Sequence, residues 1–143
     1  MQPKLTMTDT PAPHLREAIV GPLIEFNNAR ASQPENYRSL VIILSNPDTG
    51  GILGGLWGAT NFAHLHVDLL FVPEELRGTG LGRKMLLQAE REAITRGCRG
   101  AWLDTYSFQA HGFYERLGYT VFGILNDYPP GQHRIFLYKE LVT

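Results

Sequence analysis

A run of glycines between an apolar segment and a helical pattern has the residue types that bind a phosphate group. The run contains Gly78, Gly80 and Gly82, and a regular helical pattern begins directly after them. Glycine lets the backbone turn tightly and approach a ligand closely. The start of a helix presents unpaired N–H groups and the positive end of the helix dipole. Together these features predict a seat for a phosphate or pyrophosphate, and Arg77 and Arg83 add positive charge around it.

Two common nucleotide-binding loops do not fit this turn. The dinucleotide fingerprint needs glycines at its first, third and sixth positions, and Arg83 occupies the sixth. The nucleoside-triphosphate loop needs Gly-Lys followed by Ser or Thr, which Gly82-Arg83-Lys84 does not supply. A glycine-rich turn that joins a strand to a helix without binding a ligand remains an alternative at this point.

Two stretches of the sequence resemble motifs of one enzyme family. Residues 70–82 (LFVPEELRGTGLG) resemble the acetyl-CoA-binding motif of the GCN5-related N-acetyltransferases (GNAT), in which Arg or Gln is followed by x-x-Gly-x-Gly or Ala. Residues 110–119 (AHGFYERLGY) are similar to the family's Ala-x-x-Phe-Tyr-x-x-x-Gly-Phe helix. One helix and one short strand separate the two motifs, as in the family. The resemblance extends from about residue 42 to the C-terminus, and two motifs in the correct order are more specific than either alone.

The resemblance implies that acetyl-CoA is the co-substrate and that no metal is needed. In the family, main-chain groups at the end of the strand before the turn bind the pantetheine arm and stabilise the oxyanion, and here these belong to Leu70, Phe71 and Val72. The glycine turn holds the pyrophosphate, and the residues implied are Arg77, Gly78, Thr79, Gly80, Leu81, Gly82 and Arg83. Ser107 falls where the family often has a cofactor-contacting asparagine, and helix capping is its plainer role.

The resemblance also implies a proton donor and a proton acceptor. Tyr114 matches the family's tyrosine that protonates the leaving thiolate, although its spacing also suits a core position. The family often places the base on the strand before the turn, where His64, His66, Asp68 and Leu70 share one face by period two. Asp68 is preferred because a carboxylate can act through water, whereas His66 has the more suitable unperturbed pKa. Both could instead be ordinary hydrogen-bonded strand residues.

The main hypothesis is therefore an acetyl-CoA-dependent N-acetyltransferase that transfers acetyl directly to a primary amine of a small molecule, with a protein amine as a variant. Acidic and aromatic groups suit a cationic amine. Candidate pocket residues, chosen by their placement in the chain, are Glu25, Trp57, Asp104, Tyr106 and Tyr128. A non-catalytic acyl-CoA-binding module and a phosphate-binding structural domain are the alternatives.

The hydrophobic pattern predicts the elements that position these residues. Strands are expected at residues 39–45, 52–58, 62–72, 100–104, 119–124 and 134–141, with a turn at 59–61. Residues 80–96 predict an amphipathic helix, and a second helix is expected between Ser107 and Gly118. Residues 14–31 are helical but interrupted at Gly21-Pro22. The fold class is mixed α/β, and the resemblance implies the GNAT fold, a central, twisted, mostly antiparallel sheet flanked by helices.

Length and composition limit the remaining possibilities. The 143 residues suffice for one domain, so we expect a flexible N-terminus at residues 1–13 and a single N-acetyltransferase domain at 14–143. A net charge of −1 gives no reason to expect a nucleic-acid partner, and no apolar stretch has the length of a membrane span. Residues 1–13 lack the features of a secretory signal and the single Cys98 fits a reducing cytosol, so a cytoplasmic location is expected. The expected partner is a small-molecule amine. A homodimer is kept as an alternative, because many members of the resembled family are dimers.

Overall fold

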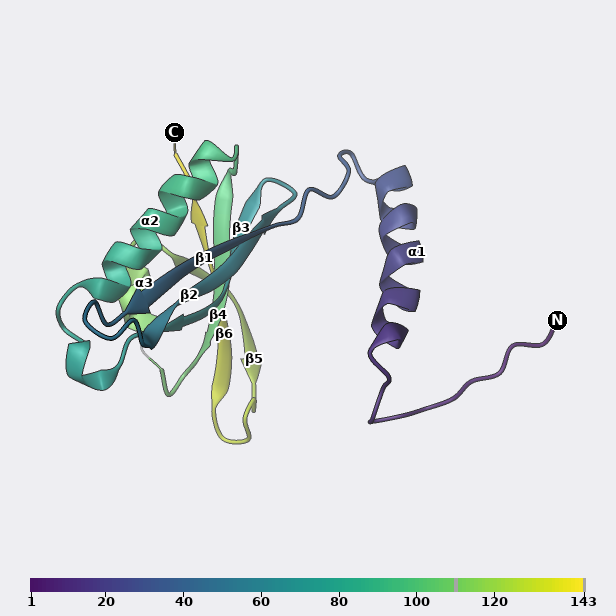
Figure 1. The fold of residues 1–143 in the computed structure, drawn as a ribbon, viewed down its shortest axis with the longest axis horizontal. Helices are drawn as coiled ribbons and strands as arrows, with labels where there is room; N and C mark the ends of the chain where they lie inside the picture. Colours follow the sequence, from purple (N-terminus) through teal and green to yellow (C-terminus); the bar gives the residue numbers. More distant parts are fainter. Residues whose placement is uncertain (110, 143) are drawn as a thin grey trace. The chain divides into compact units, whose positions relative to one another are not determined.

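The computed structural model describes residues 1–109 and 111–142, so Ala110 of the second motif and Thr143 lie outside the described residues. The chain divides into two compact units, Met1–Glu35 and Asn36–Thr143. The first unit contains one helix, α1 (His14–Arg30), and Pro22 lies inside it (Figure 1). The predicted interruption at Gly21-Pro22 is therefore wrong. Proline clashes with the Cβ atom of the residue before it, and Gly21 has no Cβ, so the helix continues past the proline.

The second unit is built on a six-stranded sheet whose strands lie in the order β1-β2-β3-β4-β6-β5 (Figure 1). The strands are β1 (Arg38–Ser45), β2 (Ile52–Asn61), β3 (His64–Phe71), β4 (Gly100–Tyr106), β5 (Thr120–Asn126) and β6 (His133–Glu140). Strands β3 and β4 are parallel, and the other neighbouring pairs are antiparallel. The predicted mixed α/β class with a mostly antiparallel sheet is confirmed.

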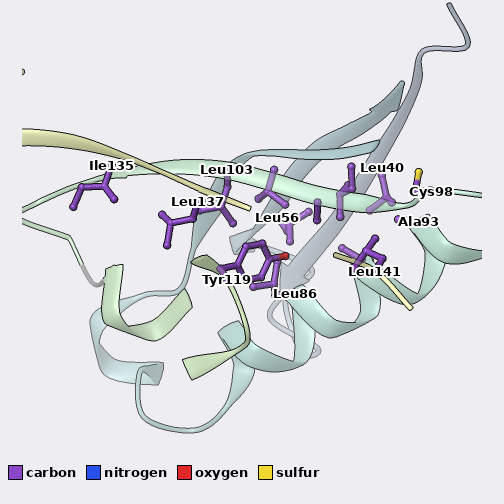
Figure 2. Close-up of a cluster of buried hydrophobic side chains, with 14 residues drawn as sticks. Leu40, Leu56, Leu86, Ala93, Cys98, Leu103, Tyr119, Ile135, Leu137 and Leu141 are labelled. Atoms are coloured by element: carbon purple, nitrogen blue, oxygen red, sulfur yellow. The ribbon is translucent and has the colours of Figure 1, made fainter. Parts of the chain in front are cut away.

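The helices of the second unit follow β3 and β4. A single 3-10 turn, η1 (Glu74–Leu76), leads from β3 to α2 (Leu81–Thr95), and α3 (His111–Arg116) follows β4. Helix α2 has apolar residues at steps of three and four, so it buries one stripe against the sheet. Figure 2 shows this core, in which Leu86 and Ala93 of α2 lie with side chains from the strands, among them Leu40, Leu56, Leu103 and Leu137.

Alternation along each strand sends every second side chain to the opposite face of the sheet, away from the core. On β4 the core face carries Ala101 and Leu103, and on β3 it carries Leu65 and Val67. The opposite face therefore carries the polar and aromatic residues of these strands and of β6, namely His64, His66, Trp102, Asp104, Tyr106, Arg134, Phe136 and Tyr138. We call this the open face.

The turn between β2 and β3 lies later than the predicted turn at residues 59–61. Strand β2 continues to Asn61, and the chain turns at Phe62 and Ala63, whose φ angles are 49° and 59°. The Asn36 amide oxygen accepts the N–H of Phe62 at 3.0 Å, and the Asn61 amide oxygen accepts the N–H of Asn36 at 3.0 Å. Because these side chains satisfy backbone groups at the turn, two non-glycine residues adopt a left-handed conformation that is otherwise uncommon.

Candidate active site

Strands β3 and β4 pair at one end and then diverge. Residues His64 to Val67 pair with Gly100 to Leu103, whereas beyond this point β3 pairs only with β2, and β4 only with β6. On its other side β3 contains a β-bulge, because Trp57 faces Leu69 and Gly58 faces Val67, which leaves Asp68 as an extra residue. A bulge bends the strand and re-aims the side chains that follow it.

The bulge corrects one sequence-based expectation. Leu70 was expected on the same face as His64, His66 and Asp68, but it packs against the hydrophobic core. The extra residue at Asp68 reverses the alternation, so Leu70 points to the face that Leu65 and Val67 also occupy. The main chain of Leu70 and Phe71 lies beyond the last pair between β3 and β4, where a further extended segment could pair with it.

The glycine turn after β3 has the geometry of an anion seat. Gly78 and Gly80 have φ angles of 78° and 85°, and a Cβ atom at either position would meet no atom within 4 Å. Gly80 is the N-cap of α2 and provides no side-chain cap, and the first turn of α2 holds no acidic residue. A helix start usually carries a Ser, Thr, Asp or Asn cap or an acidic side chain that satisfies these amides. Within the described residues, no side chain caps these N–H groups.

Side chains around the turn fix its shape. The Arg77 Nε donates to the Val72 carbonyl oxygen at 2.9 Å, and the Thr79 hydroxyl donates to the Leu76 carbonyl oxygen at 2.6 Å. A Cβ atom at Gly82 would lie 3.3 Å from Cζ of Phe113, so this glycine allows α2 and α3 to pack closely. The Arg77 side chain thus ties the turn to the end of β3, while its predicted contact with phosphate stays a prediction.

Tyr114 lies on α3, where it packs against the hydrophobic core. Its half-buried ring packs edge-on against Phe113 and Tyr119, with ring centroids 5.1 Å and 6.1 Å away. Burial, followed by the nearby Asp104 carboxylate, raises the pKa of Tyr114 to about 12. The phenol therefore keeps its proton at neutral pH, so it can serve as a proton donor, although the raised pKa makes it a weaker acid than an ordinary tyrosine.

His66 lies on the open face of β3 and stacks on Trp102 of β4. The ring centroids are 3.9 Å apart and the ring planes differ by 16°. The Nε2 atom is buried and has no hydrogen-bond partner within the described residues. Burial lowers the pKa of His66, although Asp68 and Asp104 act in the opposite direction. The imidazole is therefore neutral near pH 7, with one buried nitrogen not yet engaged.

A pocket of about 580 Å³ opens beside this stack, on the open face of β2, β3 and β4. His66, Asp68 and Trp57 line it, so the structure brings together three residues that the sequence singled out. Tyr37 and Trp102 add aromatic walls. His64 also lines the pocket, but its nitrogens lie 2.8 Å from the Phe62 carbonyl oxygen and 3.2 Å from the Tyr138 hydroxyl. The pocket combines aromatic surface with one carboxylate, which suits a cationic amine.

Comparison with known proteins identifies the family of this chain. A family model described as "Acetyltransferase (GNAT) family" matches residues 7–119. The chain belongs to this family. An acetyltransferase of Agrobacterium fabrum (strain C58) is 41% identical over 134 residues, which cover 94% of this chain and 96% of that protein. The predicted membership of the GNAT family is thereby confirmed, and the chain is an N-acetyltransferase.

Two further proteins are similar to this N-acetyltransferase. A blasticidin-S acetyltransferase of Streptomyces morookaense is 44% identical over 95 residues, which cover 66% of this chain and 70% of that protein. The crystal structure of an Agrobacterium tumefaciens protein described as an acetyltransferase has a TM-score of 0.89 and 39% identity, and the match covers 96% of this chain and 98% of that one. The arrangement of strands and helices is therefore that of solved GNAT structures.

The structure of this N-acetyltransferase corrects the expected role of Ser107 as a helix cap. Helix α3 begins at His111, and the Ser107 hydroxyl instead accepts the N–H of His133 at 3.0 Å. The Ser107 N–H donates in turn to the His133 carbonyl oxygen at 2.8 Å. These bonds join the end of β4 to the start of β6, because the strands pair there. The predicted contact between Ser107 and the cofactor stays a prediction.

The five candidate pocket residues of this enzyme fall into three groups. Trp57 lines the pocket beside His66, and Glu25 belongs to the other compact unit. Asp104, Tyr106 and Tyr128 come together around Arg134, which the sequence did not single out. Arg134 could not be found from the sequence because it meets Tyr106 only through the pairing of β4 with β6, and the two residues are far apart in the chain.

A buried polar cluster behind Tyr114 was also not predicted. Glu90 on α2 accepts the Tyr119 hydroxyl at 2.8 Å and the Lys139 ammonium at 2.7 Å. Glu90 lies four residues after Leu86, at an apolar-face position of the helix, and this was the available signal. Within the described residues, no helix is long and apolar enough to cross a membrane, and no three His, Cys, Asp or Glu side chains gather as a metal site.

Proposed function

We propose that this enzyme transfers the acetyl group of acetyl-CoA directly to a primary amine of a small molecule. The observation that carries the proposal is the uncapped start of α2 at Gly80, which lies directly after the free edge of β3. The amides at the start of α2 would hold the pyrophosphate, because no side chain of the described residues caps them and they form the positive end of the helix dipole. The N–H of Arg77 is already bonded to the Glu74 carbonyl oxygen at 3.2 Å, so that amide is not among them. The main chain from Leu70 to Val72 would hold the pantetheine arm as an added strand.

The reaction forms a bond between the amine nitrogen and the acetyl carbon and breaks the bond between that carbon and sulfur. The amine must be uncharged to attack, so its ammonium form has to lose a proton. We infer that Asp68 attracts the ammonium at the mouth of the pocket. The neutral His66 can then accept the proton, directly or through a water molecule, at whichever ring nitrogen carries no hydrogen, and Nε2 is the one without a hydrogen-bond partner within the described residues.

The leaving group of this reaction is a thiolate, which needs a proton. Tyr114 can supply it, because its phenol carries a proton at neutral pH and α3 follows directly on β4, although burial and Asp104 make this donor a weak acid. The pocket beside His66 and the phenol on α3 belong to opposite faces of the sheet. The divergence of β3 and β4 provides the opening through which acceptor and thioester would meet.

The test is release of free thiol from acetyl-CoA with a panel of primary amines and with purified protein. Time-dependent release that requires both an amine and the protein supports the proposal, and mass spectrometry of the product should show one added acetyl group. Calorimetry with acetyl-CoA and free CoA tests the seat separately. If neither ligand gives a heat of association, the proposed function is wrong.

A further inference from the structure

Three aromatic rings form a stack at the end of β4, with Tyr106 half-buried and the other two exposed. Tyr106 is the last residue of β4, Phe108 follows it closely, and Tyr128 lies in the loop between β5 and β6. The rings of Tyr106 and Phe108 are 5.2 Å apart and within 11° of parallel, and those of Tyr106 and Tyr128 are 6.1 Å apart and within 4°. We call these three rings the aromatic platform.

Arg134 supports the platform from β6. Its Nε donates to Asp104 at 2.8 Å, and its guanidinium carbon lies 5.8 Å from the Tyr106 ring centroid and 5.6 Å from that of Tyr128. A guanidinium at this distance from an aromatic face is held by the ring quadrupole. Because Asp104 compensates its charge, the platform presents ring surface with little net charge. Such a surface favours a flat, uncharged or cationic group over an anion.

Hydrogen bonds hold the loop that carries Tyr128 of the platform. Asp127 accepts the N–H of Gly131 at 2.8 Å, and the Tyr128 N–H donates to the Gln132 carbonyl oxygen at 3.2 Å, so the loop is closed on itself. Even so, Phe108 is 60% exposed and Tyr128 is 45% exposed, and neither belongs to the hydrophobic core. Rings that are rigid and exposed lose little conformational entropy on binding, which is typical of recognition surfaces.

The platform lies on the same face as the pocket of the proposed function. Trp102, Asp104 and Tyr106 alternate along β4 toward the open face, and Trp102 carries the His66 ring. The parallel ladder ends at the pair of Val67 with Leu103, and Asp68 follows directly on β3 while Tyr106 lies three residues farther along β4. With a strand rise of about 3.4 Å per residue and a gap of at least about 4.8 Å between the diverging strands, a ligand that reaches both Asp68 and the Tyr106 ring spans roughly 10 Å.

We propose that the aromatic platform binds a flat unsaturated ring of the acceptor, and that the acceptor is an amine with such a ring roughly 10 Å from its amino group. This inference rests on the proposed function, since it takes Asp68 and His66 as the site of the amine. It adds the class of acceptor and the residues that select it.

The test compares two amines that differ only in the ring. One is adenine that carries a six-carbon aminoalkyl arm, and the other is hexylamine, with acetyl-CoA as the donor. The ratio of their kcat/KM values is measured for the wild type, for Tyr128→Ala, for Tyr128→Phe, and for Phe122→Ala. Phe122 is the matched control, because it is 60% exposed on β5 and lies outside the platform.

We expect the wild type to prefer the ring-bearing amine at least tenfold, and Tyr128→Ala to reduce this ratio about tenfold, equivalent to about 1.4 kcal/mol. Tyr128→Phe and Phe122→Ala should keep the wild-type ratio, because both retain the stacked ring. An equal ratio in the wild type and Tyr128→Ala overturns the inference. Acetylation of other primary amines but not of the ring-bearing one also overturns it, and leaves the proposed function standing. Failure to acetylate any amine overturns the proposed function itself.

Discussion

The imidazole of His66 lies flat on the indole of Trp102, with 3.9 Å between the ring centroids. The contact removes the imidazole from water, and this burial lowers the pKa of His66 against the attraction of Asp68 and Asp104. A histidine that must accept a proton benefits from this arrangement, because it stays neutral at the pH of the reaction. Trp102 would thus act through His66, as a positioning residue.

The first prediction concerns the pH dependence of acetyl transfer. If His66 accepts the proton, kcat/KM should fall as pH decreases through its lowered pKa, which lies below the ordinary value of about 6.5. Trp102→Leu exposes the imidazole, so the pKa should rise and the acidic limb of the profile should move to higher pH. The measurement is kcat/KM between pH 5 and pH 9 for both proteins. An acidic limb at the same pH in both would assign the proton transfer to another group.

The second prediction concerns how the stability of the protein depends on pH. The direction of this dependence follows from the lowered pKa of His66. Between the folded pKa of His66 and the unfolded value of about 6.5, the unfolded chain binds more protons than the folded one. The free energy of unfolding should therefore decrease as pH falls from about 6.5. His66→Gln removes the titrating group and should flatten this part of the curve. Urea unfolding at a series of pH values tests it, and curves of identical slope for both proteins would contradict the shift.

The third prediction isolates the anion seat by a matched pair of glycines. Gly80 and Gly97 both have a φ of 85°, and a Cβ atom at either meets nothing within 4 Å. Leucine at either position forces a left-handed conformation, and each variant should lose about 1–2 kcal/mol of stability. Only Gly80→Leu places a side chain at the start of α2, so it alone should lose CoA affinity in calorimetry, by more than tenfold. Tight binding by Gly80→Leu would disprove the seat.

The glycine turn could be found from the sequence because its chemistry is local. Gly78, Gly80 and the following helix are contiguous, so their types and spacing already describe the seat. The bulge at Asp68 could not be found in this way, because it depends on how Trp57 and Gly58 pair with β3. Alternation alone therefore placed Leu70 on the wrong face. Alternation did place His66 and Asp68 correctly on the open face. His66 comes before the bulge and Asp68 is the bulge residue itself, so the reversal affects only the residues after them.

Contacts between distant segments account for what the sequence did not indicate. Arg134 meets Asp104 and Tyr106 because β6 pairs with β4, and no local pattern around residue 134 marks it. Glu90 left a weaker trace, as a charge at an apolar position of α2. Its partner Tyr119 directly precedes β5 and its partner Lys139 lies on β6. The cluster can therefore be predicted only when the positions of these strands relative to α2 are known.

The fourth prediction tests the proton donor. Tyr114→Phe removes only the hydroxyl, so it should slow acetyl transfer by roughly a hundredfold, in the lower range for loss of a general acid. Affinity for CoA should be nearly unchanged, because the anion seat lies on α2. Tyr119→Phe is the control, since its hydroxyl is bonded to Glu90 and should affect stability rather than the chemical step. Equal rates for wild type and Tyr114→Phe would remove Tyr114 from the mechanism.

The fifth prediction concerns the buried cluster that supports Tyr114 through the ring of Tyr119. The Glu90 side chain is 6% exposed and is held by Lys139 at 2.7 Å and by Tyr119 at 2.8 Å. Lys139→Met leaves a buried carboxylate without its cation, which should cost about 3 kcal/mol of unfolding free energy. Adding Glu90→Gln should recover part of this loss, because a neutral amide needs no counterion.

Urea unfolding of the two single variants and the double variant gives the coupling between Lys139 and Glu90. We expect a coupling energy above 1 kcal/mol, which is more than an exposed ion pair provides. A loss below 0.5 kcal/mol in Lys139→Met would mean that the pair behaves as a surface pair. The ring of Tyr119 stays in place against Tyr114 when Lys139 is replaced, so kcat of the folded Lys139→Met protein should stay close to that of the wild type, as in Tyr119→Phe. A kcat that falls with the stability of the cluster would instead link the cluster to the chemical step.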